Sequence, residues 1–377
     1  MRRFAIVSLF AILLSVVPLS ARALETPARE AILIDVDTRT VLFEKNSQAR
    51  MPTSSMSKVL TAYLVFEAIK DGRIKLDDTL PVSEKAWRMQ GSKMFVPIGE
   101  QVKVEDLLRG VIVQSGNDAT VVLAEGISGT EEAFADLMNI TAKKIGMNNS
   151  HFMNASGWPD PNHYSTAYDL ALLAYHMIKD HPGYYHYYSE KEFSFNNIKQ
   201  GNRNPLLYKN IGADGIKTGH TEDAGYGLMA SAIQNGRRLI LVVNGLESMQ
   251  QRADESARLL SWGFQNFKYI DLFKAGEAVT DAGVWMGKNK TVPIVVNDDV
   301  KAIYKLEEKD KLQLTAQVKE PLQAPIKKGT EVGVLKIKMG DFPERSIPLY
   351  TGEDVAELDL VERMIERAKI MVLGDGQ

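Results

Sequence analysis

The run MPTSSMSKVLTAYLVF, residues 51–66, places three serines and a lysine within five positions at the start of an apolar, helix-like segment. On a helix, residues three and four apart share a face, so Ser54 and Ser55 both lie beside Lys58. A lysine whose pKa is lowered by burial and nearby cations can take the proton of a serine hydroxyl. The unpaired N–H groups at a helix start also stabilise negative charge. The run therefore has the parts of a serine nucleophile and its base. Ser54 and Ser55 both remain candidate nucleophiles, and simple helix capping is the rival interpretation.

Two further segments carry polar side chains at predicted bends and strands. In QSGNDAT, Ser115 and Asn117 lie between two helical patterns, where a hydroxyl can relay a proton and a carboxamide can hold both a carbonyl and a lysine. In DGIKTGHTEDAGYG, Lys217 and Thr218 offer a cation and a hydroxyl to a carboxylate, and Gly219 leaves room for a ligand backbone beside the strand. Each motif alone also fits a capping turn or an exposed strand end. Their order along one chain makes them informative.

The elements that must position these residues follow from hydrophobic periodicity. Apolar runs over 31–36 and 40–43 predict a strand hairpin, and residues 215–221 have the pattern of an extended segment. Asn235-Gly236 between two apolar runs is a strong hairpin signal. Helical patterns cover 55–70, 104–114, 118–126, 131–145, 166–179 and 250–265. Strands near both ends with helices between them predict one sheet packed by helices, an α+β arrangement.

The composition changes beyond about residue 268. The runs VPIVV, KLQLTAQV, VGVLKIK and SIPLY alternate apolar and polar residues between lysine- and glycine-containing turns, which predicts a small all-β domain. The segment AELDLVERMIERAKIMVL then spaces apolar residues by three and four, as an amphipathic helix does. Such a helix can lie on a membrane surface, pack on the body of the chain or join another chain. Its charges are mixed and it lacks the Trp and Phe usual in surface-lying helices, so its attraction to anionic lipid is weak and membrane contact stands only slightly ahead of protein packing.

The start of the chain and the composition set limits on function. Two arginines, an apolar stretch and Ala21-Arg22-Ala23 predict an export signal over residues 1–23, and its removal takes the formal charge from −3 to −6 because three arginines are lost. A mildly acidic chain with no basic block argues against a nucleic-acid partner. The absence of cysteine removes thiol catalysis and cysteine-ligated zinc, and we expect neither a metal nor a cofactor. The cluster HPGYYHYYSE fits aromatic packing better than a metal site.

SMSK, SGN and KTGH follow one another with Ser55, Ser115 and Lys217 separated by 60 and 102 residues. This ordered set is typical of penicillin-binding proteins and class A β-lactamases. The chain resembles the low-molecular-mass penicillin-binding proteins, and most closely the type-5 D-alanyl-D-alanine carboxypeptidases. HFMNASGWPDPNHYSTAYDLA resembles the loop and helix that this family has between its second and third motifs. The resemblance covers nearly the whole chain and implies a β-lactamase/transpeptidase-like catalytic domain.

The resemblance also implies catalytic roles for three of these residues. Ser55 would be the nucleophile that accepts the acyl group, and Lys58 would be its general base. Ser115 would carry the proton to the leaving amine. Asn117 would hold the substrate peptide.

The remaining carried-over roles concern the substrate carboxylate and the oxyanion. Lys217 would support the electrostatics and, with Thr218, bind the carboxylate. The backbone N–H groups of Ser55 and His220 would form the oxyanion hole. Arg252, in MQQRADES, matches a carboxylate-binding arginine of the family, and Arg203, in GNRN, matches another basic position near the site.

The function so implied is a serine D-alanyl-D-alanine carboxypeptidase that removes the terminal D-alanine of peptidoglycan pentapeptide stems through an acyl-enzyme. β-Lactam antibiotics would inhibit it by acylating Ser55. A β-lactamase is a rival, although no Glu-x-x-x-Asn loop occurs between residues 150 and 180. Two further rivals are an endopeptidase and a non-catalytic cell-wall-binding protein. Arg252 argues mildly against an endopeptidase because it expects a free terminal carboxylate.

The expected organisation is a signal peptide over 1–23, a catalytic domain over 24–267, a β-rich domain over 268–352 and an amphipathic helix over 353–377. Together with the export signal, this places the protein in the periplasm, peripheral on the outer face of the cytoplasmic membrane. Peptidoglycan stem peptides and, through the last helix, the membrane are the expected partners.

Overall fold

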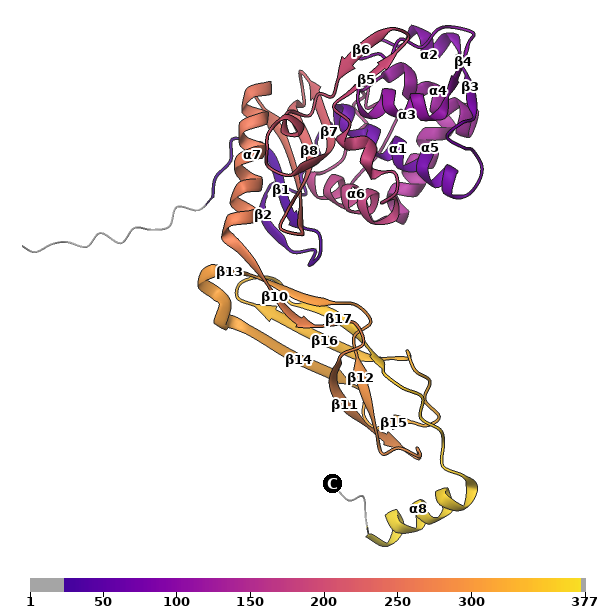
Figure 1. Cartoon of the computed structure of the whole chain (residues 1–377), viewed down its shortest axis with the longest axis vertical. Helices are drawn as coiled ribbons and strands as arrows, with labels where there is room; N and C mark the ends of the chain where they lie inside the picture. The colour runs from indigo at the N-terminus through magenta and orange to yellow at the C-terminus, as the bar shows by residue number, and fades with distance from the viewer. Residues whose placement is uncertain (1–23, 374–377) are drawn as a thin grey trace, which may run out of the picture.

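The computed structural model describes residues 24–373, so the predicted export signal over 1–23 lies outside the described residues. A mixed helix and sheet domain stands at one end of an elongated molecule (Figure 1). A narrow β domain continues from it, and one short helix lies at the far end. The α+β fold class, the all-β second domain and the terminal helix are confirmed.

The sheet of the first domain joins strands from its two ends. Its five strands are antiparallel in the order β2-β1-β9-β8-β7, so β7, which carries the KTG motif, lies at the edge. The predicted hairpin turn is confirmed: Asn235 and Gly236 join β8 to β9 with φ of 51° and 74°, values typical of a type I′ turn. The bounds are β1 Glu30–Asp35, β2 Val41–Lys45, β7 Ala213–Thr221, β8 Gly225–Gln234 and β9 Arg237–Leu246.

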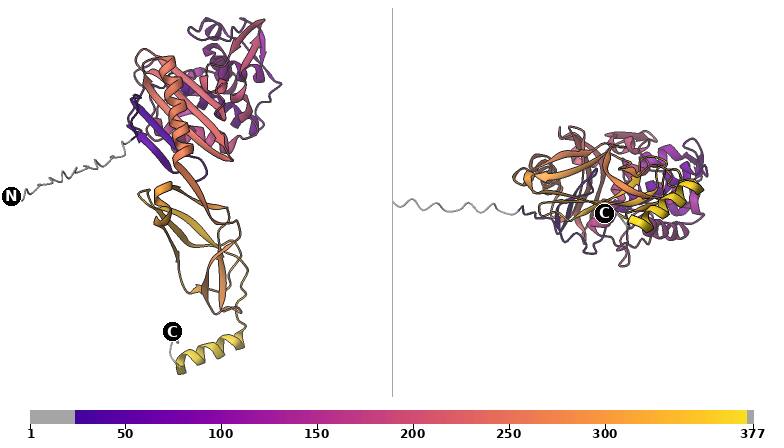
Figure 2. Two further views of the ribbon diagram at one scale, coloured as in Figure 1. Left: turned by 60° about the vertical axis from the view of Figure 1, so that its left-hand side comes forward. Right: turned by 90° about the horizontal axis from the view of Figure 1, so that it is seen from below.

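Helices cover both faces of this sheet. Helix α7 lies across one face, and the remaining helices gather on the other (Figure 2). Helix α1 is buried on almost every side by α3, α4, α5 and α6, which is why its sequence is apolar all round rather than amphipathic. The bounds are α1 Lys58–Lys70, α2 Glu84–Arg88, α3 Val104–Ile112, α4 Asn117–Ser128, α5 Glu131–Lys144, α6 Ala167–Asp180 and α7 Met249–Asn266.

The first predicted helix begins differently from the expectation of a continuous helix over 55–70. Residues Ser54–Ser57 form a 3-10 turn, η1, and the α-helix starts only at Lys58. Ser54 has a φ of 49°, in the left-handed region, so the chain cannot enter a regular α-helix at this point. This short turn decides which serine faces the lysine.

Short elements that the sequence did not indicate complete the domain. They are the hairpins β3 Thr79–Pro81 with β4 Gln101–Lys103 and β5 Glu192–Phe195 with β6 Ile198–Gly201, and the 3-10 turns η2 Tyr185–Ser189 and η3 Pro205–Tyr208. Strands of three or four residues carry too few positions to show an alternation.

The second domain has its own apolar core and two sheets, β10-β13 and β14-β16-β17-β12-β11-β15. Its first strand follows α7 directly, and Arg237 fastens this junction by donating to the carbonyls of Gly263 and Phe267 and pairing with buried Asp35. The bounds are β10 Phe267–Phe273, β11 Ala278–Trp285, β12 Thr291–Val295, β13 Val300–Lys305, β14 Leu312–Val318, β15 Leu322–Gln323, β16 Glu331–Met339 and β17 Arg345–Thr351, with the 3-10 turn η4 Leu306–Lys311.

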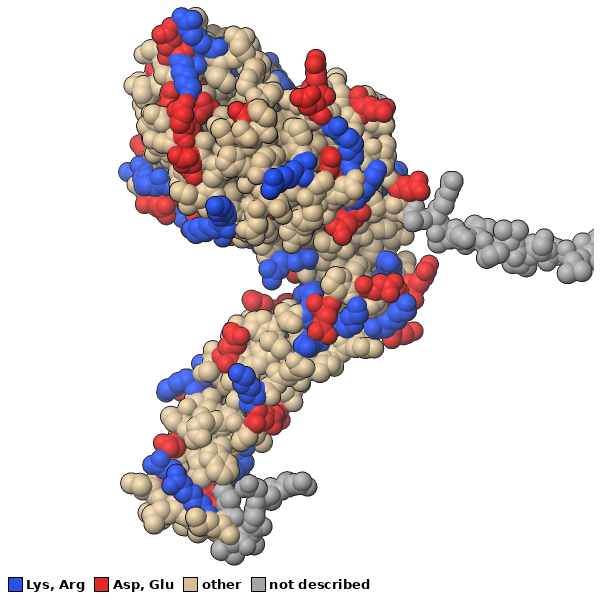
Figure 3. Space-filling model, turned by 180° about the vertical axis from the view of Figure 1, so that it is seen from behind, with Lys and Arg blue, Asp and Glu red and all other residues tan. Residues whose placement is uncertain are grey.

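The terminal helix begins later than the start of the expected segment 353–377, of which residues 374–377 lie outside the described residues. Helix α8 spans Leu360–Leu373, because Val355 and Glu357 still bridge to Ile326 and Gly287 of the β domain. Five of its apolar side chains are exposed, which disfavours packing on the chain's own body: Leu360, Val361, Met364, Ile365 and Met371. None of the described helices is long and apolar enough to cross a membrane. On the face shown in Figure 3, positive and negative side chains are interspersed rather than gathered by sign.

Candidate active site

A cavity of about 500 Å³ opens between the edge strand β7 and the helical part of the first domain. The structure brings seven of the ten predicted site residues to its wall: Ser55, Ser115, Arg203, Thr218, Gly219, His220 and Arg252. The other three, Lys58, Asn117 and Lys217, are buried beside it, with 1, 6 and 3% of their surface exposed. The three separate motifs therefore converge on one place.

The turn η1 separates the two candidate serines. Lys58 Nζ lies 3.0 Å from Ser55 Oγ, whereas Ser54 Oγ donates to Thr221 Oγ1 at 3.3 Å. A 3-10 helix has three residues per turn, so residues three apart eclipse and residues four apart do not. The geometry thus pairs Lys58 with Ser55, a choice that α-helical spacing alone left open.

Three acceptors surround the Lys58 amine. Besides Ser55, they are Asn117 Oδ1 at 2.7 Å and the carbonyl oxygen of Ser156 at 2.6 Å. Burial, followed by the charge of Arg203, lowers the pKa of Lys58 to about 7, against the opposing effect of Asp118. A neutral amine has two hydrogens, which the Asn117 and Ser156 oxygens can accept. Its lone pair then faces Ser55 Oγ.

The second motif forms a strained bend. Ser115 has a φ of 60°, and its hydroxyl is buried without a hydrogen-bond partner within residues 24–373. Asn117 donates to the carbonyl of Gln90 at 2.7 Å, which fixes its oxygen toward Lys58. Asp118 accepts from the N–H groups of Met94 and Phe95, so it holds a loop in place, as expected for an acid at a helix start. The unpartnered Ser115 hydroxyl lines the cavity and is therefore available to a substrate, whereas Gln114 Oε1, which also lacks a partner among the described residues, does not line it.

Cations dominate the other end of the cavity. Burial, and then the charges of Lys58, Arg203 and Arg252, hold the pKa of Lys217 well below its ordinary value. Burial lowers the pKa of Arg252 to about 10, and its Nε has no hydrogen-bond partner in the described chain. A carboxylate bound among these groups would relieve their repulsion and favour their charged forms. This end of the cavity is therefore suited to an anion.

Glycine allows β7 to approach the nucleophile's segment. A Cβ at Gly219 would lie 2.9 Å from the carbonyl oxygen of Thr53 and 3.3 Å from Cβ of Ser54. The His220 ring packs on Tyr226, with centroids 4.0 Å apart. That position leaves the backbone of His220, rather than its imidazole, as the group suited to an oxyanion.

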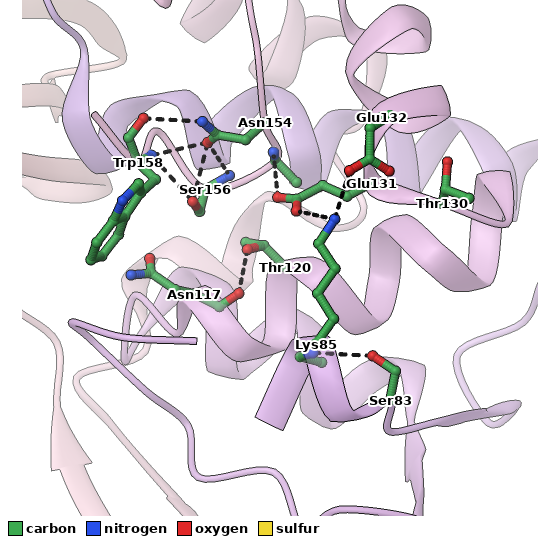
Figure 4. A network of polar contacts seen from close by, with 12 residues as sticks. Ser83, Lys85, Asn117, Thr120, Thr130, Glu131, Glu132, Asn154, Ser156 and Trp158 are labelled. Atoms are coloured by element: carbon green, nitrogen blue, oxygen red, sulfur yellow. Dashed lines mark hydrogen bonds and ion pairs between the residues drawn. The ribbon is translucent and has the colours of Figure 1, made fainter. Parts of the chain in front are cut away.

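The loop within HFMNASGWPDPNHYSTAYDLA supplies the third acceptor of Lys58, the Ser156 carbonyl, which the sequence did not indicate as a site group. The Asn154 carboxamide oxygen accepts from the N–H groups of Gly157 and Trp158 at 2.8 and 2.9 Å, and its nitrogen donates to the Trp158 carbonyl (Figure 4). Glu131 accepts from the Ala155 N–H and pairs with Lys85. These contacts fix the Ser156 carbonyl. A backbone oxygen leaves no side-chain signature, and the turn-forming Asn154 is the residue that could have pointed to this carbonyl.

No group of three or more His, Cys, Asp or Glu side chains that could hold a metal ion occurs among the described residues. Of the two histidines in HPGYYHYYSE, His181 packs against Tyr63 and Phe66 with ring centroids 4.7 and 5.7 Å apart. His186 packs on Tyr187.

Comparison with known proteins gives a consistent result over both domains. Residues 18–248 match the family model described as D-alanyl-D-alanine carboxypeptidase, and residues 267–357 match that of the penicillin-binding protein 5 C-terminal domain. A D-alanyl-D-alanine carboxypeptidase of Haemophilus influenzae is 39% identical over 364 residues, 92% of this chain and 90% of that protein.

Two solved structures illustrate the likeness. Penicillin-binding protein 5 of Haemophilus influenzae superposes with a TM-score of 0.83 at 38% identity, covering 89% of this chain and 99% of that one. Penicillin-binding protein D2 of Listeria monocytogenes, solved in its ampicillin-bound form, superposes with a TM-score of 0.60 at 30% identity, covering 64% of this chain and 99% of that one.

Proposed function

The chain belongs to the D-alanyl-D-alanine carboxypeptidase family and is a low-molecular-mass penicillin-binding protein of type 5, and on that premise we propose that Ser55 is its nucleophile and Lys58 its base. The observation that supports this assignment is the Lys58 amine, 3.0 Å from Ser55 Oγ, with a pKa of about 7 and two further oxygens to accept its hydrogens. The family acts on peptidoglycan peptides and binds β-lactams.

Acylation begins when neutral Lys58 takes the proton of the Ser55 hydroxyl. Ser55 Oγ forms a bond to the carbonyl carbon of the penultimate D-alanine, and the carbonyl π electrons move onto oxygen. The N–H groups of Ser55 and His220 stabilise that oxyanion. The Asn117 carboxamide, held by Lys58 and Gln90, lies beside the cavity and supports the peptide.

The leaving amine needs a proton as the C–N bond breaks. We assign this step to Ser115, whose buried hydroxyl has no other partner in the part of the chain that the structure describes. Ser115 donates its proton to the amine nitrogen of the departing D-alanine and recovers one from protonated Lys58. Lys58 returns to its neutral form, and the acyl group remains as an ester on Ser55.

The terminal carboxylate of the substrate accounts for the cation cluster. Arg252, Lys217 and Thr218 would bind it, with Arg203 at the cavity wall. A cross-linked peptide that lacks a free carboxylate at this point gains none of this attraction, which favours carboxypeptidase over endopeptidase action.

Water completes the cycle by hydrolysing the ester. The loop between residues 150 and 180 contains no glutamate, and the group nearest to Lys58 from that loop is the Ser156 carbonyl, which cannot accept a proton from water. Neutral Lys58 is the base that remains for this step. The absence of the glutamate-positioned water by which class A β-lactamases deacylate supports stable inhibition by penicillin over β-lactamase action.

The test is D-alanine release from a soluble peptide ending in D-alanyl-D-alanine. Ser55→Ala removes the release, and Ser54→Ala retains most of it. Wild-type protein that releases no D-alanine yet hydrolyses penicillin with rapid turnover would contradict the assignment in favour of a β-lactamase. Release from Ser55→Ala would contradict the nucleophile.

For the cellular setting, we propose export through residues 1–23 and a mature chain from about Leu24, with a catalytic domain over 24–267 and a β domain from 268. The exposed apolar side of α8 would rest on the outer face of the cytoplasmic membrane, at the end of the molecule far from the cavity (Figure 1). Membrane fractionation with and without residues 353–377 tests this: unchanged partitioning would rule out the anchor.

A further inference from the structure

His163 is a buried histidine that the proposed reaction does not use. It lies in the loop 157–164 with 5% of its surface exposed, and its ring meets that of Phe152 edge to face, with centroids 5.4 Å apart. Both ring nitrogens have partners: Nδ1 lies 3.2 Å from the backbone nitrogen of Met153, and Nε2 lies 2.8 Å from Ser57 Oγ. The side chain therefore joins the loop to the turn η1, which carries the nucleophile.

The two contacts determine which nitrogen of this imidazole carries the hydrogen. A backbone N–H can only donate, so Nδ1 accepts and has no hydrogen of its own. Burial, which outweighs the opposing charge of Asp160, lowers the pKa of His163 to about 4, and the ring is therefore neutral at about pH 6 and above. A neutral imidazole with a bare Nδ1 has its hydrogen on Nε2, which donates to Ser57 Oγ.

Ser57 extends this contact across the turn η1. Its hydroxyl lies 2.5 Å from Thr53 Oγ1, and because it accepts from His163 it can donate to Thr53. Thr53 comes just before the turn and Ser57 is its last residue, so the two hydroxyls join its ends. The Thr53 carbonyl also accepts from the Met56 N–H at 3.1 Å. Ser55 thus lies inside a turn that is closed by one backbone and one side-chain hydrogen bond.

The turn needs this support because its first residue is strained. Ser54 has a φ of 49°, a left-handed conformation that is unfavourable for a residue with a side chain and persists where the surrounding contacts enforce it. Relaxation toward an α-helix, with 3.6 residues per turn instead of three, would turn Ser55 away from the face of Lys58. The distance of 3.0 Å between Lys58 Nζ and Ser55 Oγ therefore depends on the contacts that hold the turn.

Glycine brings the loop against the turn. Gly157 has a φ of 77°, and a Cβ at this position would lie 1.8 Å from the Ser54 carbonyl oxygen and 3.2 Å from Ser57 Oγ. Beyond His163, the backbones of Met51 and Ser165 exchange hydrogen bonds of 2.8 and 3.1 Å. Packing thus sets the distance between the loop and the turn, and the hydrogen bond from the imidazole orients the hydroxyl of Ser57.

We propose that His163 is a positioning residue for the acylation step. Its neutral imidazole donates from Nε2 to Ser57, which in turn holds Thr53, and this path keeps η1 in the form that places Ser55 Oγ beside Lys58. Because His163 acts through the turn, it sets the rate of acylation rather than the affinity for the β-lactam or the peptide. The inference rests on the proposed function, since it takes Ser55 as the nucleophile.

The experiment separates the roles of the two ring nitrogens. His163→Gln can place its amide nitrogen near the position of Nε2 and keep the donor to Ser57, whereas the shorter His163→Asn keeps an acceptor for Met153 alone. Saturation kinetics with a chromogenic cephalosporin give the rate constant of acylation and the dissociation constant of the complex that precedes it. We expect His163→Asn to lower the rate constant about tenfold and to change the dissociation constant less than about twofold. His163→Gln should retain most of the wild-type rate constant.

Ser57→Ala tests whether the effect passes through the Ser57 hydroxyl. It should lower the rate constant by a factor similar to that of His163→Asn, and the double variant should be no slower than either single variant. His151→Asn is the matched control, because His151 lies close to the same loop and its Nδ1 bonds to the Asn162 carbonyl rather than to the turn. This control should leave both constants unchanged.

A wild-type rate constant in His163→Asn, with folding confirmed by thermal unfolding, would overturn the positioning role. Losses that multiply in the double variant would do the same, and so would a larger loss in His163→Gln than in His163→Asn, which would assign the effect to the contact with Met153. If His163→Asn does not fold, Ser57→Ala decides, and a wild-type rate constant there refutes the role. These outcomes on a wild type that forms a penicillin adduct refute this inference alone. Wild type that forms no adduct and releases no D-alanine would overturn the proposed function as well.

Discussion

The lowered pKa of Lys58 predicts how the rate of acylation falls on the acid side of its pH profile, which we call the acid limb. With a pKa of about 7, about half of Lys58 is neutral at pH 7, about a tenth at pH 6 and about a hundredth at pH 5. At the ordinary lysine value of 10.5, only about one molecule in three thousand would be neutral at pH 7. The rate of Ser55 acylation is therefore predicted to fall about tenfold per pH unit below 7.

The positive charge of Arg203 accounts for part of the lowered pKa of Lys58. Its removal should therefore move the acid limb of the acylation rate to higher pH. Without the positive charge, protonated Lys58 is less disfavoured, its pKa rises and the limb shifts to higher pH. A charge interaction of about 1.4 kcal/mol corresponds to one pH unit, and we expect a shift of up to about that size in Arg203→Gln. Glutamine can still contact Ser92, the hydrogen-bond partner of Arg203.

The assay is the second-order rate constant for acylation by a fluorescent penicillin, from pH 5 to 9 at fixed ionic strength. The position of the limb is the readout rather than its height, because Arg203 also lies at the cavity wall. Arg203→Lys keeps the charge and should keep the limb. A flat profile between pH 5.5 and 8 in wild type, or a limb that moves to lower pH in Arg203→Gln, would refute the reasoning.

Three further substitutions test the frame around the site. Gly219→Ala places a Cβ 2.9 Å from the Thr53 carbonyl oxygen. It should slow acylation by penicillin at least about tenfold and lower the free energy of thermal unfolding by about 1–3 kcal/mol. A wild-type acylation rate would contradict the close approach of the two segments. Asn154→Ala removes the acceptor of the Gly157 and Trp158 N–H groups. We expect the free energy of unfolding in urea to fall by about 1–3 kcal/mol and acylation by penicillin to become slower. Unchanged acylation kinetics would show that other contacts hold the Ser156 carbonyl. Arg252→Ala should lower kcat/KM for a peptide with a free terminal carboxylate about 30-fold, corresponding to about 2 kcal/mol. The kcat/KM for the same peptide with a C-terminal amide should change much less. Equal losses of kcat/KM for the two peptides would contradict the role of Arg252 in binding the carboxylate.

Much of the fold and part of the site could be predicted from short sequence patterns whose local conformation is well defined. Asn235-Gly236 predicts its hairpin because that pair adopts positive φ at little cost, and Gly219 in an extended run predicts room for a ligand backbone beside the strand. The edge position of β7 is a finding of the structure. Helical spacing alone left Ser54 and Ser55 open, and the family resemblance implied Ser55. The structure adds the physical reason, since a left-handed φ at Ser54 creates the 3-10 turn that pairs Ser55 with Lys58.

Long-range contacts explain most of what the sequence did not show. The Ser156 carbonyl acts through a backbone atom fixed by Asn154 and Glu131, and no residue type marks it. A cavity of about 630 Å³ joins Arg50 to the loop 157–164, more than a hundred residues away, and to Thr221 at the end of β7. Such juxtapositions depend on the packing of the whole domain, which periodicity in a short window does not encode.

The central claim is that Ser55, and not Ser54, takes the acyl group. Intact-mass spectrometry after penicillin treatment tests it with wild type, Ser55→Ala and Ser54→Ala, and peptide mapping locates the adduct. One adduct on wild type and on Ser54→Ala, mapped to Ser55, with none on Ser55→Ala, is the predicted result. An adduct that persists in Ser55→Ala, or that disappears in folded Ser54→Ala, would contradict the account.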